Sequence, residues 1–195
     1  MELSIYPIAV EVSSMNIKKW NARLSLLTFA LLLIHEGYQL YAYLTFYYNP
    51  TLSMLSGYAA AGCFVLHGIL SAICVFALHD SKTIVYKKLN IRTLLQRISA
   101  VMIILLLPIH IFSFSLLQSS VGGIGYILVE AVQIIYYGVL SCHIALSFSN
   151  ALITLGRLSD MKKKRIIDIV VLVICTLLFI AVSVIITMTH TKIFG

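Results

Sequence analysis

Most of the six histidines in this chain of 195 residues lie within apolar segments. Four of them occur one per segment in the first four such segments: His35, His67, His110 and His143. An ionisable side chain inside a membrane is costly, and by default it has a function and a partner. Glu36 and Glu130 are the only acidic residues well inside these segments, so carboxylates cannot pair with four imidazoles. The pattern therefore indicates that a shared ligand holds the histidines.

Imidazole is a common metal ligand. Two imidazoles on opposite faces of a porphyrin give a six-coordinate haem iron, which transfers electrons and has no open position for other chemistry. Four histidines fit two haems b, and the nearest alternative is one haem with two structural histidines. A zinc or copper site would favour locally clustered ligands, and no such pair occurs here. A proton relay would usually add acids aligned with the histidines.

The composition shows what kind of elements must position these residues. The chain is 61% hydrophobic and 11% charged, whereas soluble domains contain about a quarter charged residues. A soluble enzyme and a disordered chain are both excluded. The net charge of +7 comes from Lys and Arg in short blocks between apolar runs. This distribution is typical of membrane topology, and we expect no nucleic-acid partner.

Five apolar segments follow one another along the chain, at residues 24–46, 58–78, 98–117, 125–155 and 169–190. Each is long enough to cross a hydrocarbon core of about 30 Å as a helix. Helices are required because the bilayer offers no water to backbone groups. The sequence thus predicts an all-α, transmembrane five-helix bundle that forms a single membrane domain over residues 1–195.

The positive residues predict the orientation of the bundle. Thirteen of the fourteen Lys and Arg precede the first segment or lie between the second and third, or the fourth and fifth. Positive loops face the cytoplasm, so the N-terminus is expected inside and the C-terminus outside. Counted from the charged residue at the inner end of each segment, each of the four histidines is roughly 18–21 Å from the inner boundary. These charged residues are Arg23, Asp80, Arg97 and Arg157. We therefore expect all four at similar depth.

Two short motifs accompany the histidines. The run Gln-Arg-Ile-Ser at 96–99 places its arginine thirteen residues before His110, and the run Thr-Leu-Gly at 154–156 begins eleven residues after His143. Together with one histidine on each of four segments, this layout resembles the cytochrome b membrane anchors of succinate dehydrogenases and fumarate reductases. The resemblance is to the single-chain, five-span, two-haem type. Ala100 replaces the glycine that is usual in the first motif.

The resemblance implies a set of roles. It pairs His35 with His110 around a distal haem, and His67 with His143 around a proximal haem. The chain would catalyse no dicarboxylate chemistry itself. It would pass electrons between an iron–sulfur subunit, docked on the cytoplasmic side with a flavoprotein, and a membrane quinone, for which menaquinone is expected. The location would be the cytoplasmic (inner) membrane of a prokaryote. Ser141 stands where some members carry a glutamate, so proton coupling through that position is not implied.

Two further sets of residues could serve such a protein. Quinone chemistry needs groups that exchange protons near the quinone oxygens. The candidates in the outer half are Glu130, Gln39, Gln133 and Glu36. Haem propionates pair with arginines through charge-assisted hydrogen bonds, and the candidates at the inner ends are Arg97, Arg92 and Arg157. For each residue the alternative is an ordinary hydrogen bond between helices or an anchor at a helix end.

Two other functions remain open from the residues. His67 and His79 are twelve residues apart, which is slightly similar to b-type cytochromes of hydrogenases or formate dehydrogenases that place two ligands on one span. No second segment repeats this spacing. The alternative of another class is a small-solute transporter without a cofactor. His79 and His190 lie at segment ends, where an interfacial position is a sufficient explanation.

Overall fold

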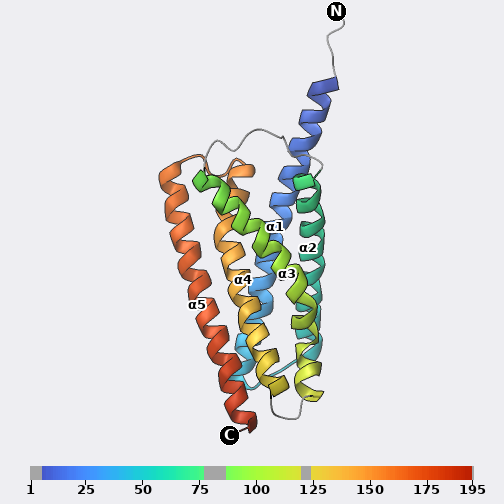
Figure 1. Ribbon diagram of the computed structural model, residues 1–195, viewed down its shortest axis with the longest axis vertical. Coiled ribbons are helices and arrows are strands. Elements are labelled where there is room, and N and C mark those ends of the chain that lie inside the picture. Colours follow the sequence, from blue (N-terminus) through green and yellow to red (C-terminus); the bar gives the residue numbers. More distant parts are fainter. Residues whose placement is uncertain (1–5, 77–86, 120–123, 195) are drawn as a thin grey trace, which may run out of the picture. The chain divides into compact units, whose positions relative to one another are not determined.

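The computed structural model describes residues 6–76, 87–119 and 124–194, with side chains described within 15–76, 91–113 and 125–188. These residues form long helices and no strand (Figure 1). The helices are α1 (Tyr6–Thr45), α2 (Pro50–Phe76), α3 (Lys87–Ser119), α4 (Ile124–Thr154) and α5 (Met161–Phe194). The expectation of an all-helical protein is therefore confirmed. His79 lies outside the described residues, as does the side chain of His190.

Four of these helices, α2 to α5, contain a stretch that is long and apolar enough to cross a membrane. The chain thus has the character of a multi-pass membrane protein. The helix α1 is not among the four, because His35, Glu36 and Gln39 lower the mean hydropathy of its apolar half. The fifth span and the orientation of the termini stay predictions.

The helices extend beyond the apolar segments that the sequence marks. The segment at 24–46 falls almost wholly within α1, which begins at Tyr6, and the segment at 98–117 lies within α3, which begins at Lys87. Lys, Arg and Leu all have good helix propensity, so a helix need not end where its apolar run ends. The positions of charged residues therefore do not mark the ends of these helices.

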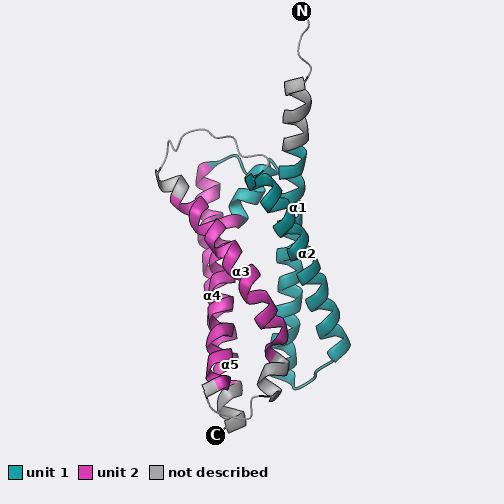
Figure 2. Cartoon of the chain, turned by 45° about the vertical axis from the view of Figure 1, so that its right-hand side comes forward, with its two compact units in different colours: residues 1–83, 148–160 teal, residues 84–147, 161–195 magenta. Residues whose placement is uncertain are grey.

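The chain divides into two compact units. Unit 1 contains residues 1–83 and 148–160, and unit 2 contains residues 84–147 and 161–195 (Figure 2). Unit 1 thus holds α1, α2 and the last turns of α4. Unit 2 holds α3, the larger part of α4, and α5.

Unit 1 is built on an antiparallel pair of helices joined by a short turn. Asn49 begins α2 as its N-cap, because its side-chain oxygen accepts the backbone N–H of Leu52 at 3.2 Å and Pro50 occupies the first helical position. The hydroxyl of Tyr38 on α1 donates to the Asn49 carbonyl at 3.2 Å. The end of α4 joins this unit through Phe148, whose ring meets that of Phe29 edge to face at 5.3 Å. These contacts fix the register between α1 and α2.

Unit 2 is built on α3 and α4, which also run antiparallel. Along α3, Ser99, Ile103 and His110 share one face, since their spacings of four and seven residues return to the same side of a helix. Ile103 is only 1% exposed and fills the interval between the two polar residues. The helix α5 packs against α4 at Gly138, where an added Cβ would lie 3.4 Å from the ring of Phe179.

The helix α4 ends at a glycine that its geometry requires. Gly156 has a φ of +70°, in the left-handed region that side chains disfavour. Its N–H donates to the Ile153 carbonyl at 2.9 Å, and the N–H of Arg157 donates to the Leu152 carbonyl at 2.9 Å. This pair of bonds is a Schellman motif, which satisfies carbonyls at the end of the helix. It gives a physical reason for the glycine in the 154–156 motif.

Candidate functional site

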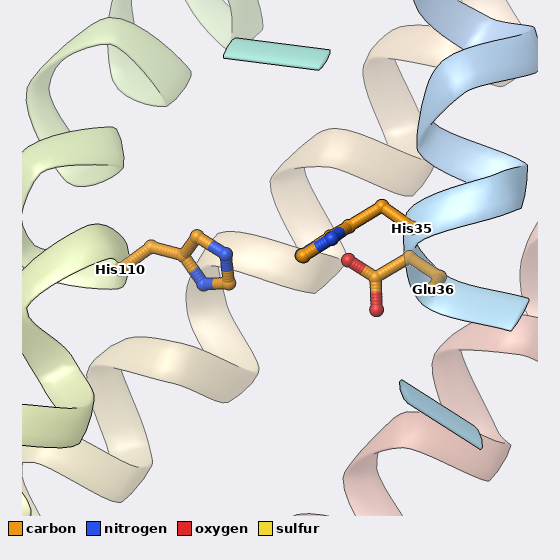
Figure 3. A group of neighbouring side chains, drawn as sticks. All are labelled: His35, Glu36 and His110. Carbon is orange, nitrogen blue, oxygen red and sulfur yellow. The ribbon is translucent and has the colours of Figure 1, made fainter. Parts of the chain in front are cut away.

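The four predicted ligands lie on four different helices. His35 is on α1 and His67 on α2, both in unit 1, whereas His110 on α3 and His143 on α4 belong to unit 2. Figure 3 shows His35 and Glu36 extending from α1, and His110 extending from α3. The proton on each ring can be inferred from the hydrogen bonds that the ring makes within its own unit.

The ring of His35 is held by α2. Its Nδ1 lies 3.1 Å from the hydroxyl oxygen of Ser56, and that hydroxyl donates its own proton to the Ser53 carbonyl at 3.0 Å. With that proton on the Ser53 carbonyl, Ser56 accepts from the imidazole, and this assignment puts the ring proton on Nδ1 and the lone pair on Nε2. Gly57 makes room for the ring, because a Cβ there would lie 3.0 Å from the His35 Cε1 atom.

The ring of His143 is held by α3 in the same way. Its Nδ1 lies 3.0 Å from the Ser99 hydroxyl oxygen and 3.1 Å from the Gln96 carbonyl oxygen. The Ser99 hydroxyl donates to the same carbonyl at 3.0 Å. Since a carbonyl oxygen only accepts, Nδ1–H is the donor and Nε2 is again the lone-pair nitrogen. Ser99 belongs to the 96–99 motif, which thus contacts the histidine of α4.

The ring of His110 is held by α4. Its Nδ1 lies 2.8 Å from the side-chain oxygen of Gln133, which accepts the Nδ1 proton. Tyr136 stacks on the imidazole with ring centroids 4.5 Å apart and an interplanar angle of 15°, and Tyr137 meets it edge-on at 5.5 Å. The hydrogen bond and the stacked ring together fix the plane of the imidazole.

His67 differs from the other three. Its Nδ1 is buried and has no hydrogen-bond partner among the residues that the structure describes. One turn further along α2, Ser71 donates to the side-chain oxygen of Asn21 on α1 at 3.1 Å, and the backbone of the same Asn21 lies close to the His67 imidazole. The orientation of the His67 ring is therefore not set by a bond at Nδ1.

The arrangement of three of the histidines suits metal ligation. A histidine that binds a metal through one ring nitrogen commonly donates its other N–H to a carbonyl, carboxylate or similar acceptor, which fixes the tautomer and raises the basicity of the ligand. His35, His110 and His143 each have this bond, and in each the acceptor comes from the neighbouring helix of the same unit. Their Nε2 atoms are the nitrogens that could ligate haem iron.

The expectation that all four histidines lie at similar depth is wrong within each unit. His35 is level with Ser56 on α2, and His67 follows Ser56 by eleven residues, or about 16 Å of helix. His143 is level with Ser99 on α3, and His110 follows Ser99 by the same interval. The depth estimate fails because it took Arg97 and Arg23 as inner boundaries. Arg97 is two residues from Ser99, which is level with His143, and Arg23 is twelve residues before His35, which places it level with His67.

The histidines of the two units occupy similar positions along their own helices. His35 and His110 lie toward the end of the first helix of their pair, near the start of the second helix. His67 and His143 lie toward the end of the second helix. The implied pairs, His35 with His110 and His67 with His143, each take one member from each unit. The pairing itself stays a prediction.

The quinone candidates have different surroundings. Gln39 donates to the Ser53 hydroxyl oxygen at 2.6 Å, which is the helix–helix contact considered as its alternative role. Gln133 accepts from His110 through its oxygen, but its buried amide nitrogen has no partner among the described residues. Glu36 and Glu130 are half-buried. A quinone role for any of these residues stays a prediction.

The arginine candidates also differ from one another. Arg97 and Arg157 are exposed, and a contact with a haem propionate stays a prediction for both. Arg92 is engaged in unit 2 by Asp168 of α5, with two nitrogen–oxygen distances of 2.9 Å, so its contacts give no support to a propionate role. The sequence reasoning missed Asp168. The available signal was a single acid within the basic start of the fifth helix.

Comparison with known protein families, with curated proteins and with solved structures found no match to this chain.

Proposed function

We propose that the chain is the membrane-anchor subunit of a succinate:quinone or quinol:fumarate oxidoreductase and holds two haems b. One observation carries the proposal: His35, His110 and His143 each donate Nδ1–H to the neighbouring helix and carry the lone pair on Nε2. This arrangement matches the one that histidine ligands of metals commonly have. His110 and His143 also lie on helices that are apolar enough to cross a membrane, where an ionisable side chain indicates a function.

The two levels within each unit support two haems over one. His35 and His67 are about 16 Å apart along α2, as are His143 and His110 along α3, so neither unit can offer both of its histidines to a single iron. Each haem would take one ligand from each unit. The pairs, His35 with His110 and His67 with His143, are those that the resemblance implies.

Haem bound at these residues would supply one-electron transfer. The chain's own contribution is to present the ring nitrogens, and to hold the ring planes of His35, His110 and His143 through their Nδ1 hydrogen bonds. The electrons would come from or go to an iron–sulfur subunit docked with a flavoprotein on the cytoplasmic side. A membrane quinone, for which menaquinone is expected, would be the other redox partner. The resemblance of the 96–99 and 154–156 motifs is the basis for these partners and for placement in a prokaryotic inner membrane.

The haem content of purified variants tests the proposal. The wild-type chain should contain two haems by the pyridine haemochrome assay. Alanine at any one of the four histidines should remove at least one haem, because an axial ligand is lost. His190→Ala is the matched control, since it removes a histidine outside the proposed set, and it should retain both haems.

Three results would contradict parts of this function. A wild-type protein without haem would end the electron-transfer proposal and favour the transporter alternative. Full haem content in any of the four alanine variants would remove that residue from the ligand set. Co-purification with a hydrogenase or formate dehydrogenase, in place of a succinate-oxidising flavoprotein, would assign the chain to another class of b-type cytochrome.

A further inference from the structure

Arg92 joins all three helices of unit 2. From α3, its Nε donates to the Leu146 carbonyl of α4 at 3.1 Å, and Nη2 reaches the Ala145 carbonyl at 3.5 Å. The same guanidinium forms a forked pair with Asp168 of α5, with Nη1 and Nη2 each 2.9 Å from a carboxylate oxygen. Lys164 adds a second cation to Asp168 at 2.9 Å.

This geometry fixes α4 close to a predicted ligand. Ala145 and Leu146 are two and three residues beyond His143, less than one helical turn away. The Asp168 carboxylate holds the plane of the guanidinium, because a forked arginine–carboxylate pair constrains both groups. A guanidinium held in this plane limits the rotation of α4 about its own axis at the level of His143.

Arg92 also continues the contact that holds the His143 ring. Arg92, Gln96 and Ser99 are spaced by four and three residues, so they lie on one face of α3. Gln96 and Ser99 bind Nδ1 of His143 directly, whereas Arg92 binds the backbone that carries His143. Four of the five N–H groups of Arg92 are used in the bonds given above.

We propose that Arg92, held by Asp168, is a positioning residue for His143. It sets the orientation of the His143 imidazole relative to the haem iron that this histidine would bind. The inference rests on the proposed haem function, because its effect is read on the haem that His143 would bind. It assigns Arg92 a role in place of the propionate contact expected from the sequence.

The test compares Arg92→Gln and Asp168→Asn with Arg165→Gln in the purified full chain. Arg165 is an exposed arginine one residue after Lys164, so its variant removes the same charge from the same region. The readouts are the haem-to-protein ratio, the thermal midpoint of unfolding and the low-temperature EPR spectrum. The EPR spectrum reports the relative orientation of the two axial imidazoles of a haem. We expect Arg92→Gln to change the EPR signal of one haem, or to lose that haem, with a smaller change of the same kind in Asp168→Asn. Arg165→Gln should match the wild type.

A merely structural role would lower the thermal midpoint of Arg92→Gln without altering either EPR signal, and this outcome would overturn the proposal. An identical change in Arg165→Gln would overturn it as well, since the effect would then be one of net charge. If the wild-type chain contains no haem, the proposed function fails, and histidine ¹⁵N NMR of the same variants decides the positioning role. Unchanged His143 ring-nitrogen resonances in Arg92→Gln would then overturn the inference separately.

Discussion

Three of the four imidazoles, those of His35, His110 and His143, are oriented by atoms that another helix supplies. Ser56 of α2 holds His35 and Gln133 of α4 holds His110, while Ser99 and the Gln96 carbonyl of α3 hold His143. At the scale of the residue, the chemistry of a histidine thus depends on one oxygen across a helix interface. That oxygen decides which ring nitrogen carries the proton, and hence which nitrogen could ligate iron.

Gly57 offers a test at this scale. In Gly57→Ala the new Cβ would lie 3.0 Å from the His35 Cε1 atom, which is closer than nearly all normal contacts, so the ring must give by a few tenths of an ångström against its bond with Ser56. We expect the variant to lose the haem bound by His35, as measured by haem content and by the visible spectrum.

Gly62→Ala is the matched control, because it lies on the same helix and its Cβ would meet nothing within 4 Å. That variant should keep both haems. Its helix should gain roughly 0.5–1 kcal/mol of stability from the reduced freedom of the unfolded chain. Equal haem content in the two alanine variants would show that Gly57 does not make room for a ligand.

At the scale of the element, the helices are defined by their ends as much as by their apolar faces. The N-cap at Asn49 and the turn that follows α1 bring α2 back against α1, and the Schellman motif at Gly156 ends α4 before α5 begins at Met161. The two helix ends use different groups. At the start of α2, the side-chain oxygen of Asn49 accepts a backbone N–H. At the end of α4, the left-handed conformation of Gly156 lets backbone N–H groups donate to the last carbonyls of the helix.

Gly156→Ala should therefore destabilise the protein. A side chain at a φ of +70° costs about 1 kcal/mol relative to glycine, and the two carbonyl bonds of the motif would weaken with it. The free energy of unfolding can be measured in a denaturing detergent titration. Gly37→Ala, within α1 and with open space around its Cβ, should show no comparable loss. A stability equal to that of the wild type would indicate that α4 ends differently.

At the scale of the whole molecule, the role of α1 decides the topology. Four helices, α2 to α5, are apolar enough to cross a membrane, and four crossings would leave both ends of the spanning region on one side. If α1 also crosses, the termini lie on opposite sides. The positive residues predict that second arrangement, with the N-terminus in the cytoplasm.

Labelling of introduced cysteines distinguishes the two arrangements. With the four native cysteines replaced by alanine, a cysteine at position 2 should react with a membrane-impermeant maleimide only after the cells are opened. A cysteine at position 194 should react in intact cells. The same reactivity at both positions would exclude five spans, and labelling of position 2 alone in intact cells would reverse the predicted orientation.

The sequence by itself determined that the chain is helical and suited to a membrane, because long apolar runs have one backbone solution in lipid. It also singled out the four histidines, since an imidazole in an apolar run is conspicuous whatever surrounds it. It marked Asp168 only as a single acid in a basic segment, and it could not give the partner of Asp168, because Arg92 is seventy-six residues away in the chain.

The tertiary structure decided the register of the helices and therefore the levels of the histidines. A charged residue gives the depth of a histidine on another helix only when the register of the two helices is known. Arg97 is two residues from Ser99, which is level with His143. The contacts of Ser99 with His143 and of Gln133 with His110 set that register directly. These contacts place the histidines at two levels, whereas residue counting had placed them at one depth. The level of a side chain in a helix pair depends on its neighbour across the interface, and not on its distance from a charged residue in its own sequence.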